Sequence, residues 1–342
     1  MATIKDVARL AGVGVGTASR VVSGKGSVAL ATAERIRKVI EELEFRPSHA
    51  ARTLLSGSSQ MVGVYIPVLK GTFYTPILQV IDTELRAAGL HMVVAFGCGD
   101  GDARSQAVEG IRFLIERGCD GMVVISDALL DPDIESLGPK QSKLAVLNHC
   151  FTSIPAQCFT ADHAQGGVLA AQTLLKLRHR QFAVIAGPST SPDNVARISG
   201  FMAELARQGV ADTQVLTLES DFSSEGGWGA ARALLATGHA FTALFCANDE
   251  MAVGALSYFQ QAGVAVPGAV SVLGYDDTYS AEYSAPRLTS VHVPWGDITL
   301  NALHWLLNQC YGSEHAVARQ FPISVTWRAS VAISSVVALQ PA

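Results

Sequence analysis

The sequence predicts a small all-α head that contains a helix-turn-helix, joined to a larger α/β domain of two lobes with parallel sheets. Three observations predict this fold class. Short amphipathic helical patterns separated by glycine occupy the start of the chain. From Met61 onward, apolar runs of strand length alternate with helical stretches. The length of 342 residues also exceeds what one hydrophobic core usually organises.

The charge of the chain is distributed unevenly. The net charge is -5, yet residues 1–60 hold nine Lys and Arg residues against five Asp and Glu residues. A basic head on an acidic body predicts that the head, and not the body, binds a polyanion.

Several classes of protein are disfavoured by motifs that the sequence lacks. No apolar stretch is long enough to cross a membrane, and MATIKDVARL lacks the apolar core of a signal peptide, so we expect a cytoplasmic protein with no membrane partner. The six cysteines form no Cys-x-x-Cys pair, and the sequence has neither a Gly-Lys-Ser/Thr phosphate loop nor a Gly-x-Ser-x-Gly elbow. We therefore expect no metal, no cofactor and no catalytic residue.

Three helices are expected in the head. Thr3 and Asp6 have the spacing of a capping box at the start of the first helix, and Gly12 is suited to end it. The second helix is expected over residues 15–23. The third is expected over residues 32–44, where apolar residues recur at helical spacing.

The stretches IKDVARLAGV, TASRVVSGKGSV and LEFRPSHAARTL closely resemble the head of the lactose/galactose repressor (LacI/GalR) family. The resemblance is contiguous over about fifty-five residues and includes the helix cap, the turn glycine and the Ser19-Arg20 pair. It implies a sequence-specific DNA-binding transcription regulator that acts as a homodimer on palindromic operator DNA. It further implies a repressor of carbohydrate utilisation that a sugar or sugar derivative controls. A three-helix cap on an enzyme is the alternative.

The resemblance also implies which residues contact DNA. Val15, Gly16 and Arg20 stand at base-reading positions, and Arg20 is able to make a bidentate contact to guanine. Thr17 and Ser19 would lie near phosphates. The full set of implied DNA-binding residues is Thr3, Val15, Gly16, Thr17, Ser19, Arg20 and Leu54.

Two glycines depart from the family pattern in the second helix. Gly14 stands where a capping serine is usual, and Gly16 stands where a larger residue is usual. Glycine inside a helix costs about 0.5–1 kcal/mol relative to alanine. We expect a softer recognition helix and weaker or less selective operator binding.

Residues 48–59 are expected to form a hinge. In the family such a segment becomes helical when two chains pair on DNA, where a leucine enters the minor groove, and Leu54 is the matching residue. An ordinary linker with a chance leucine is the alternative. The expected domains are a DNA-binding domain at 1–47, this hinge, and an effector-binding and dimerisation domain at 60–342 with two lobes and three crossovers.

Seven apolar runs are expected to be strands in the large domain, namely MVGVYI, LHMVVAF, GMVVIS, KLAVLN, FAVIAG, TALFCAN and VSVLGYDD. Ligands of parallel α/β folds bind beyond the carboxyl ends of the strands, where Asn148, Asn248 and Asp276 stand. Carboxylates and amides suit a hydroxyl-rich ligand, and the loop residues Phe73 and Phe222 are able to stack on a sugar ring.

The large domain resembles the same family over residues 61–335, in stretches such as ANDEMAVGAL and VPGAVSVLGYDD. The resemblance implies a fold like that of the periplasmic binding proteins, in which Arg197 clamps the sugar. Taken alone, Arg197 is equally a surface residue and Asp276 a turn cap. The predicted effector-binding residues are Phe73, Asn148, Arg197, Phe222, Asn248 and Asp276.

We expect the ligand to close the two lobes and thereby shift a dimer between states that can and cannot dock on DNA. Departures from the family at Lys70-Gly71-Thr72, His149 and Trp295 leave the identity of the ligand open. Two other functions remain as alternatives: a sugar-binding protein without a DNA-regulatory role, and a sugar enzyme that uses a nucleotide.

Overall fold

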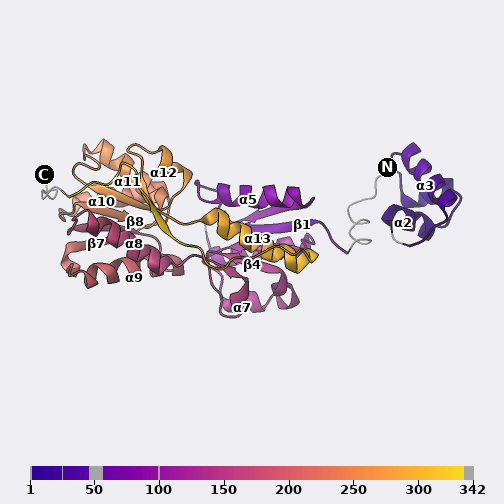
Figure 1. The fold of residues 1–342 in the computed structure, drawn as a ribbon, viewed down its shortest axis with the longest axis horizontal. Helices are drawn as coiled ribbons and strands as arrows, with labels where there is room; N and C mark the ends of the chain where they lie inside the picture. The colour runs from indigo at the N-terminus through magenta and orange to yellow at the C-terminus, as the bar shows by residue number, and fades with distance from the viewer. Residues whose placement is uncertain (1, 25, 46–56, 99–100, 335–342) are drawn as a thin grey trace.

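The computed structural model of the chain describes residues 2–24, 26–45, 57–98 and 101–334. The predicted hinge segment of residues 48–56, including Leu54, therefore lies outside the described residues. Figure 1 shows the N-terminal helices and a larger body of α/β lobes.

The head consists of three helices, α1 (Ile4–Leu10), α2 (Val15–Ser23) and α3 (Leu30–Glu42). The predicted capping box is present, because the Asp6 amide donates to Thr3 Oγ1 at 3.3 Å and the Thr3 amide donates to Asp6 Oδ2 at 3.0 Å. Gly12 follows α1 with a φ of +63°, as expected of a residue that ends a helix. The helices enclose a small core of Val7, Ala8, Ala11, Ala18, Ile36 and Val39.

The predicted bounds of the third helix were wrong by two residues at each end. The helix begins at Leu30 and not at Thr32, because the Thr32 and Ala33 amides already donate to the carbonyl of Ala29. It ends at Glu42, and Glu44 has a left-handed φ of +47° that no longer continues the helix.

Lobe 1 is a parallel sheet with the strand order β2-β1-β3-β4-β5. Its strands are β1 (Met61–Ile66), β2 (His91–Phe96), β3 (Gly121–Ile125), β4 (Leu144–Leu147) and β5 (Cys158–Phe159). Its helices are α5 (Tyr74–Ala87), α6 (Ala103–Glu116), α7 (Asp131–Glu135) and α13 (Trp295–Tyr311), with short 3-10 turns η1 (Gly138–Lys143) and η2 (Pro155–Gln157). Helix α13 comes from the end of the chain and packs on α5 and on β3, β4 and β5 (Figure 1).

Lobe 2 has the strand order β11-β10-β9-β8-β6-β7, in which β11 alone is antiparallel to its neighbour among the described strands. Its strands are β6 (Phe182–Ala186), β7 (Val215–Glu219), β8 (Ala243–Cys246), β9 (Ser271–Asp276), β10 (Thr289–His292) and β11 (Ser324–Thr326). Its helices are α8 (His163–Lys176), α9 (Pro192–Arg207), α10 (Ser224–Ala236), α11 (Asp249–Gln261) and α12 (Tyr279–Tyr283), with the 3-10 turn η3 (Asp212–Gln214).

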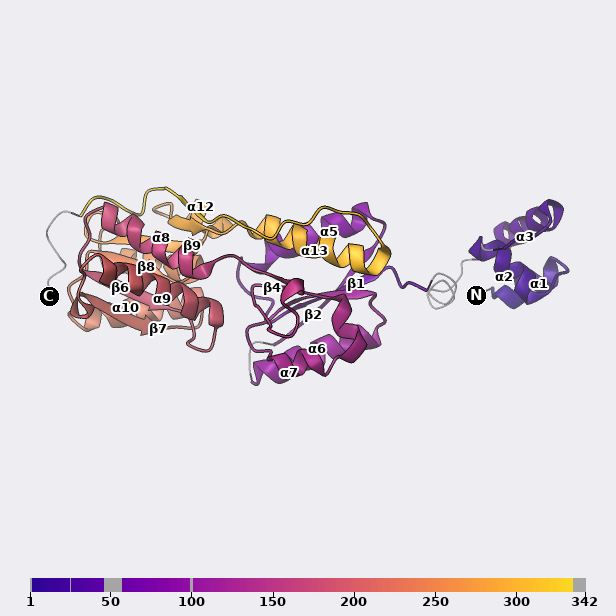
Figure 2. The ribbon, with the colours of Figure 1, turned by 60° about the horizontal axis from the view of Figure 1, so that its bottom comes forward.

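All seven apolar runs that predicted strands form strands, and the two-lobed parallel fold is confirmed. Strands β5, β7, β10 and β11 were not predicted. The chain passes between the lobes three times, after β5, after β10 and after α13, and the same crossing region is seen from another side in Figure 2. No helix in the described part of the chain is long and apolar enough to span a membrane.

The first residues of lobe 1 are held by the carboxylate of Asp120. Its Oδ2 accepts hydrogen bonds from Ser58 Oγ at 2.6 Å and from the Gln60 amide at 2.9 Å, and its Oδ1 accepts from the Ser59 amide at 2.9 Å. The Tyr311 hydroxyl at the end of α13 donates to the same Oδ2 at 2.9 Å. The Asp120 side chain therefore connects the start of the large domain to α13, the helix that follows the second crossing between the lobes.

Candidate functional site

A cavity of about 700 Å³ lies between the two lobes, at the carboxyl ends of the strands. All six predicted effector-binding residues line it, although they come from different elements of both lobes. They are Phe73 before α5, Asn148 after β4, Arg197 on α9, Phe222 before α10, Asn248 at the start of α11 and Asp276 at the end of β9.

Three of these residues have a left-handed backbone. The φ angles are +58° at Asn148, +66° at Phe222 and +100° at Asp276. Residues other than glycine rarely adopt such angles, and strain of this kind gathers at ligand sites. The backbone conformation thus marks two of the predicted strand ends, Asn148 and Asp276, and the loop residue Phe222.

The Arg197 side chain is buried, with 4% of its surface exposed. Its guanidinium lies 3.6 Å from the centre of the Tyr275 ring, and its Nη1 donates to the carbonyl of Ala247. Its Nε has no hydrogen-bond partner among the described residues. The charge is therefore held against an aromatic face, and the Nε–H is available to a ligand.

Arg197 is not a surface residue, and a buried histidine connects it to the other lobe. The His163 Nε2 lies 2.9 Å from Asn148 Oδ1, and its Nδ1 lies 2.9 Å from the Tyr275 hydroxyl. Burial, and then the charge of Arg197, hold the pKa of His163 well below its ordinary value. An amide oxygen accepts only, so the neutral ring carries its proton on Nε2 and accepts at Nδ1. The Asn148 amide nitrogen remains to donate to a ligand.

Two carboxyl groups on the cavity wall are poorly solvated. Burial raises the pKa of Asp276 to about 6, although the nearby Arg197 opposes the shift. Burial and the neighbouring Asp127 raise the pKa of Asp193 to about 7. Asp193 Oδ2 has no hydrogen-bond partner among the described residues. An unsatisfied buried acceptor in a cavity is a natural partner for a ligand hydroxyl.

The aromatic side of the cavity is built from both lobe 1 and the second crossing. The Phe73 ring packs edge-on against Tyr74 and Trp295, with ring centres 5.1 Å apart in each pair. Trp295 Nε1 donates to Asp276 Oδ1 at 3.2 Å. The tryptophan at the start of α13 thus supplies an apolar wall and orients the carboxylate.

Asn248 and Phe222 have a clear structural role. Asn248 Oδ1 accepts from the Met251 amide at 2.9 Å and caps α11, and its Nδ2 donates to the Phe222 carbonyl at 2.9 Å. The Asn248 amide group therefore fixes the loop that carries Phe222, and it contributes to a ligand mainly through its second N–H.

Two hydrogen-bonded contacts join the lobes beside the cavity. Ser191 Oγ on lobe 2 donates to Asp127 Oδ2 on lobe 1 at 2.6 Å. Glu250 Oε1 on lobe 2 accepts from the amide and the hydroxyl of Thr72 on lobe 1, each at 2.6 Å. Both contacts depend on the distance between the lobes.

Sequence reasoning missed several residues of this wall. Asp127 comes two residues after β3, so the rule on strand ends was sufficient to find it. Asp193 stands one helical turn before Arg197, and that spacing places both on the same face of α9. Glu250 gave no local signal, because its partner Thr72 is distant in the sequence.

The predicted DNA-binding residues lie on the head as follows. Val15, Gly16 and Arg20 are exposed along α2, and Thr17 and Ser19 are half-buried beside them. Gly14 caps α2 without a side-chain hydrogen bond, as expected. The hydroxyl of Thr3 is already used in the cap of α1, and Leu54 lies outside the described residues.

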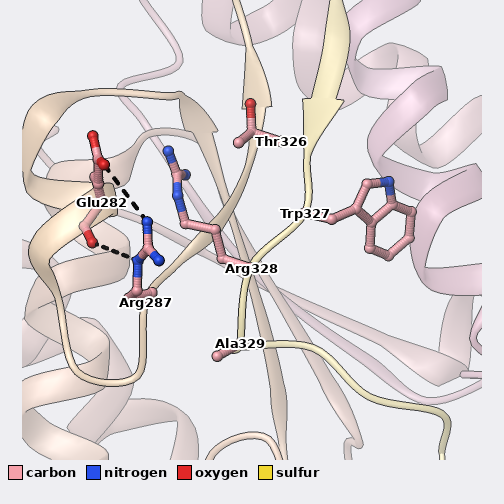
Figure 3. A pocket seen from close by; sticks show the side chains of 6 residues that line it. All are labelled: Glu282, Arg287, Thr326, Trp327, Arg328 and Ala329. Carbon is pink, nitrogen blue, oxygen red and sulfur yellow. Dashed lines mark hydrogen bonds and ion pairs between the residues drawn. The ribbon is translucent and has the colours of Figure 1, made fainter.

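A second hollow lies on lobe 2, lined by Glu282, Arg287, Thr326, Trp327, Arg328 and Ala329 (Figure 3). Its basic groups are already paired: Arg287 with Glu282 at 3.5 Å, and Arg328 with Asp277 at 2.7 Å. It offers little to a charged ligand compared with the cavity between the lobes.

Residues 3–48 match the model of bacterial regulatory proteins of the lacI family, and residues 171–331 match the model of a periplasmic binding protein-like domain. The chain is 30% identical to the HTH-type transcriptional regulator GalR of Escherichia coli strain K12, over 86% of this chain and 85% of that protein.

Two solved structures are similar over most of the chain. A transcriptional regulator of the LacI family from Burkhoderia phymatum is 52% identical, with a TM-score of 0.77 over 80% of this chain and 99% of that one. The lac repressor dimer bound to operator and the anti-inducer ONPF is 26% identical, with a TM-score of 0.81 over 97% of this chain and 99% of that one.

Proposed function

The chain belongs to the lacI family of bacterial regulatory proteins, and from this premise we propose that it represses a carbohydrate-utilisation operon under the control of a sugar bound between its lobes. Its relatives are transcriptional regulators and not enzymes, so the chain is a transcriptional regulator, as the sequence predicts. The two alternatives raised from the sequence, a sugar-binding protein without a regulatory role and a sugar enzyme, do not fit this family.

The observation that carries the sugar proposal is the convergence of Asn148, Arg197 and Asp276 on one cavity. They offer an amide donor, a guanidinium donor and a carboxylate acceptor, next to the aromatic rings of Phe73 and Trp295. Polar groups that fix hydroxyls, together with aromatic faces that cover C–H groups, suit a sugar.

The proposal assigns DNA binding to residues 1–47, hinge formation to residues 48–59, and effector binding and dimerisation to residues 60–342. Val15, Gly16 and Arg20 read bases and Thr17 and Ser19 approach phosphates, while Leu54 enters the minor groove. The exposed face of α2 and the basic charge of the head support this assignment.

A dimer on a palindromic operator fits the two-fold symmetry of such sites, and the lac repressor structure that this chain resembles is a dimer bound to operator. The protein would act in the cytoplasm, where the operator is. The sugar changes operator affinity through its preference for one arrangement of the lobes.

The test is fluorescence anisotropy of the full chain on DNA from its own promoter, with a scrambled duplex as control. We expect specific binding whose affinity falls by on the order of 10³-fold or more between about 50 and 200 mM salt, if about 6–10 phosphates are contacted. We also expect one sugar to change the operator affinity, and the operator to change the affinity for that sugar by the same factor. Equal binding to both duplexes, with every sugar tested, would overturn the proposal.

A further inference from the structure

The inference concerns the charge of the effector and rests on the proposed function. We propose that the effector is a neutral sugar, without a phosphate or carboxylate group, because the cavity that receives it is lined by carboxyl groups. Six acidic residues line the cavity against two basic ones. The acidic residues are Asp127, Asp193, Asp221, Glu225, Glu250 and Asp276.

The two basic residues do not offset this excess. The Arg197 guanidinium is already engaged with the Tyr275 ring and the Ala247 carbonyl. Its Nη2 lies 3.4 Å from His163 Nδ1, so both terminal nitrogens already have protein partners, and its Nε has none among the described residues. A forked pair from the guanidinium to a phosphate or carboxylate would compete with these contacts. Lys70 is exposed, where solvent and salt screen its charge. An anionic group inside the cavity would therefore meet one buried guanidinium, already shared with Tyr275, Ala247 and His163, against six acidic residues.

Two acidic residues of the cavity wall, Asp193 and Asp276, have surroundings that disfavour their charged form. Burial raises the pKa values of Asp193 and Asp276, which means that a further negative charge beside them is disfavoured. A neutral hydroxyl instead donates to them, and Asp193 Oδ2 is an acceptor without a partner among the described residues. A ligand hydroxyl therefore gains a hydrogen bond to these carboxyl groups, whereas a ligand phosphate or carboxylate is repelled by them.

The hydrogen bonds between Ser191 and Asp127 and between Thr72 and Glu250 join the lobes without using the carboxyl groups of Asp193 and Asp276. Asp127 accepts from Ser191, and Glu250 accepts from Thr72 and Ser224. Both residues line the cavity, and Asp127 raises the pKa of the neighbouring Asp193. The cavity thus combines acidic side chains, an acceptor of Asp193 without a partner among the described residues, and an aromatic wall, which together suit an uncharged polyol.

The test uses matched sets of compounds on the full chain by thermal shift and titration calorimetry. Each neutral aldose, and a set of neutral disaccharides, is paired with its phosphate and its uronate or aldonate. We expect at least one neutral compound to raise Tm by several degrees at saturation, and its charged partners to bind at least about tenfold more weakly. A phosphate or carboxylate that binds as tightly as its neutral partner, or a panel in which no neutral sugar binds, would overturn the inference.

A charge-removing variant supplies the second arm. In Asp193→Asn the gap between the neutral sugar and its uronate should narrow by about tenfold, because a buried repulsion is removed. Glu219→Gln removes the same charge from an exposed residue of β7 that does not line the cavity, and it should leave the gap nearly unchanged. An unchanged gap in both variants contradicts the electrostatic argument.

The outcomes separate this inference from the proposed function. If a sugar phosphate changes binding to promoter DNA, the regulator stands and the inference on charge fails. If a neutral sugar binds but leaves DNA binding unaltered, the inference stands and sugar control of the operator fails.

Discussion

Ser191 and Asp127 form a hydrogen bond of 2.6 Å between the two lobes, with the serine hydroxyl as donor and the carboxylate as acceptor. Ser191 is also the N-cap of α9, the helix that carries Asp193 and Arg197. The bond therefore links the position of lobe 1 to the helix that presents the charged groups of the cavity.

A double-mutant cycle tests this link. Ser191→Ala and Asp127→Ala should each lower the free energy of unfolding by about 1–2 kcal/mol, because each removes a hydrogen bond to a charged group. The double variant should lose clearly less than the sum, with a coupling of about 1 kcal/mol. Thermal and urea unfolding measure the cycle. Strictly additive losses would show that the bond does not join the lobes in solution, and Ser191→Thr serves as the control that keeps the hydroxyl.

The glycines of the recognition helix predict a gain of function. Gly14→Ser and Gly16→Ala should together stabilise α2 by about 1 kcal/mol and tighten operator binding several-fold, through a better cap and a lower entropy cost. A Cβ at either position has open space around it. Gly229→Ala on α10 also places its Cβ in open space and should stabilise lobe 2 without changing DNA affinity. Anisotropy on promoter DNA and thermal unfolding check both effects, and unchanged operator affinity in the first pair would refute the idea.

Substitutions of Arg20 and of Thr17 should weaken operator binding in different ways. Arg20→Lys loses the fork that pairs with guanine, and it should cost about 1–3 kcal/mol on the operator while relaxing base preference at one position. Thr17→Ala should weaken all sequences alike, because a phosphate contact carries no base information. Binding to a library of single-base operator variants distinguishes the two. An Arg20→Lys profile that keeps the original base preference would argue against base contact.

Arg197 should be intolerant of lysine. Lysine keeps the charge but cannot lie flat on Tyr275, so Arg197→Lys should lower the free energy of unfolding by about 2–4 kcal/mol and abolish the response to sugar. Arg207 lies on the same helix, is mostly exposed and pairs with Glu204, so Arg207→Lys should cost less than about 1 kcal/mol. Thermal unfolding and sugar-dependent anisotropy provide the two readouts. If both substitutions changed stability and the response to sugar equally, Arg197 would have no specific role in the cavity.

The pH dependence of stability should carry the signature of Asp193. Its pKa is about 7 in the folded chain against an ordinary 3.8, so the folded chain holds a proton that the unfolded chain has released between these values. The free energy of unfolding should therefore fall as pH rises from about 4 to about 7, by at most about 1.4 kcal/mol per pH unit from this group. Asp193→Asn should flatten that slope and be more stable than the wild type above pH 7.

The contribution of Asp131 to the free energy of unfolding should change with pH in the opposite direction. Hydrogen bonds from Ser153 and Thr152 lower its pKa to about 2, so its contribution is present above about pH 4 and is lost as the pH falls toward 2. Asp131→Asn should change the acid limb of the stability profile and leave the window from 4 to 7 alone. A slope in that window that is the same in the wild type and in Asp193→Asn would contradict the assignment.

The sequence was sufficient to predict the lobes because near-continuous apolar runs identify buried parallel strands. Strands β7 and β10 were missed for a physical reason. VLTLE in β7 is an edge strand whose residues are partly exposed, and TSVH in β10 is short and mixes polar with apolar residues although most of it is buried. Burial by tertiary neighbours, and not local pattern, makes these segments strands.

The cavity was predicted in part for a similar reason. Strand ends can be read from the sequence, and they led to Asn148, Asn248 and Asp276. The cavity residues that the sequence did not predict line the cavity because of how the two lobes face each other. Neither the contact of Glu250 with Thr72 nor the burial that shifts the pKa of Asp193 has a local signature. Such residues are found only when both lobes are in view.

The carboxylate of Asp120 has a mechanical consequence. One of its oxygens holds Ser58 and Gln60 at the exit toward the head and, at the same time, Tyr311 at the far end of α13. The first residues of the large domain are thus bonded to lobe 1 and to the end of α13, and the described hydrogen bonds of Asp120 include none to lobe 2. A movement of α13 would therefore alter the hydrogen bond from Tyr311 to Asp120, and with it the carboxylate that holds Ser58 and Gln60.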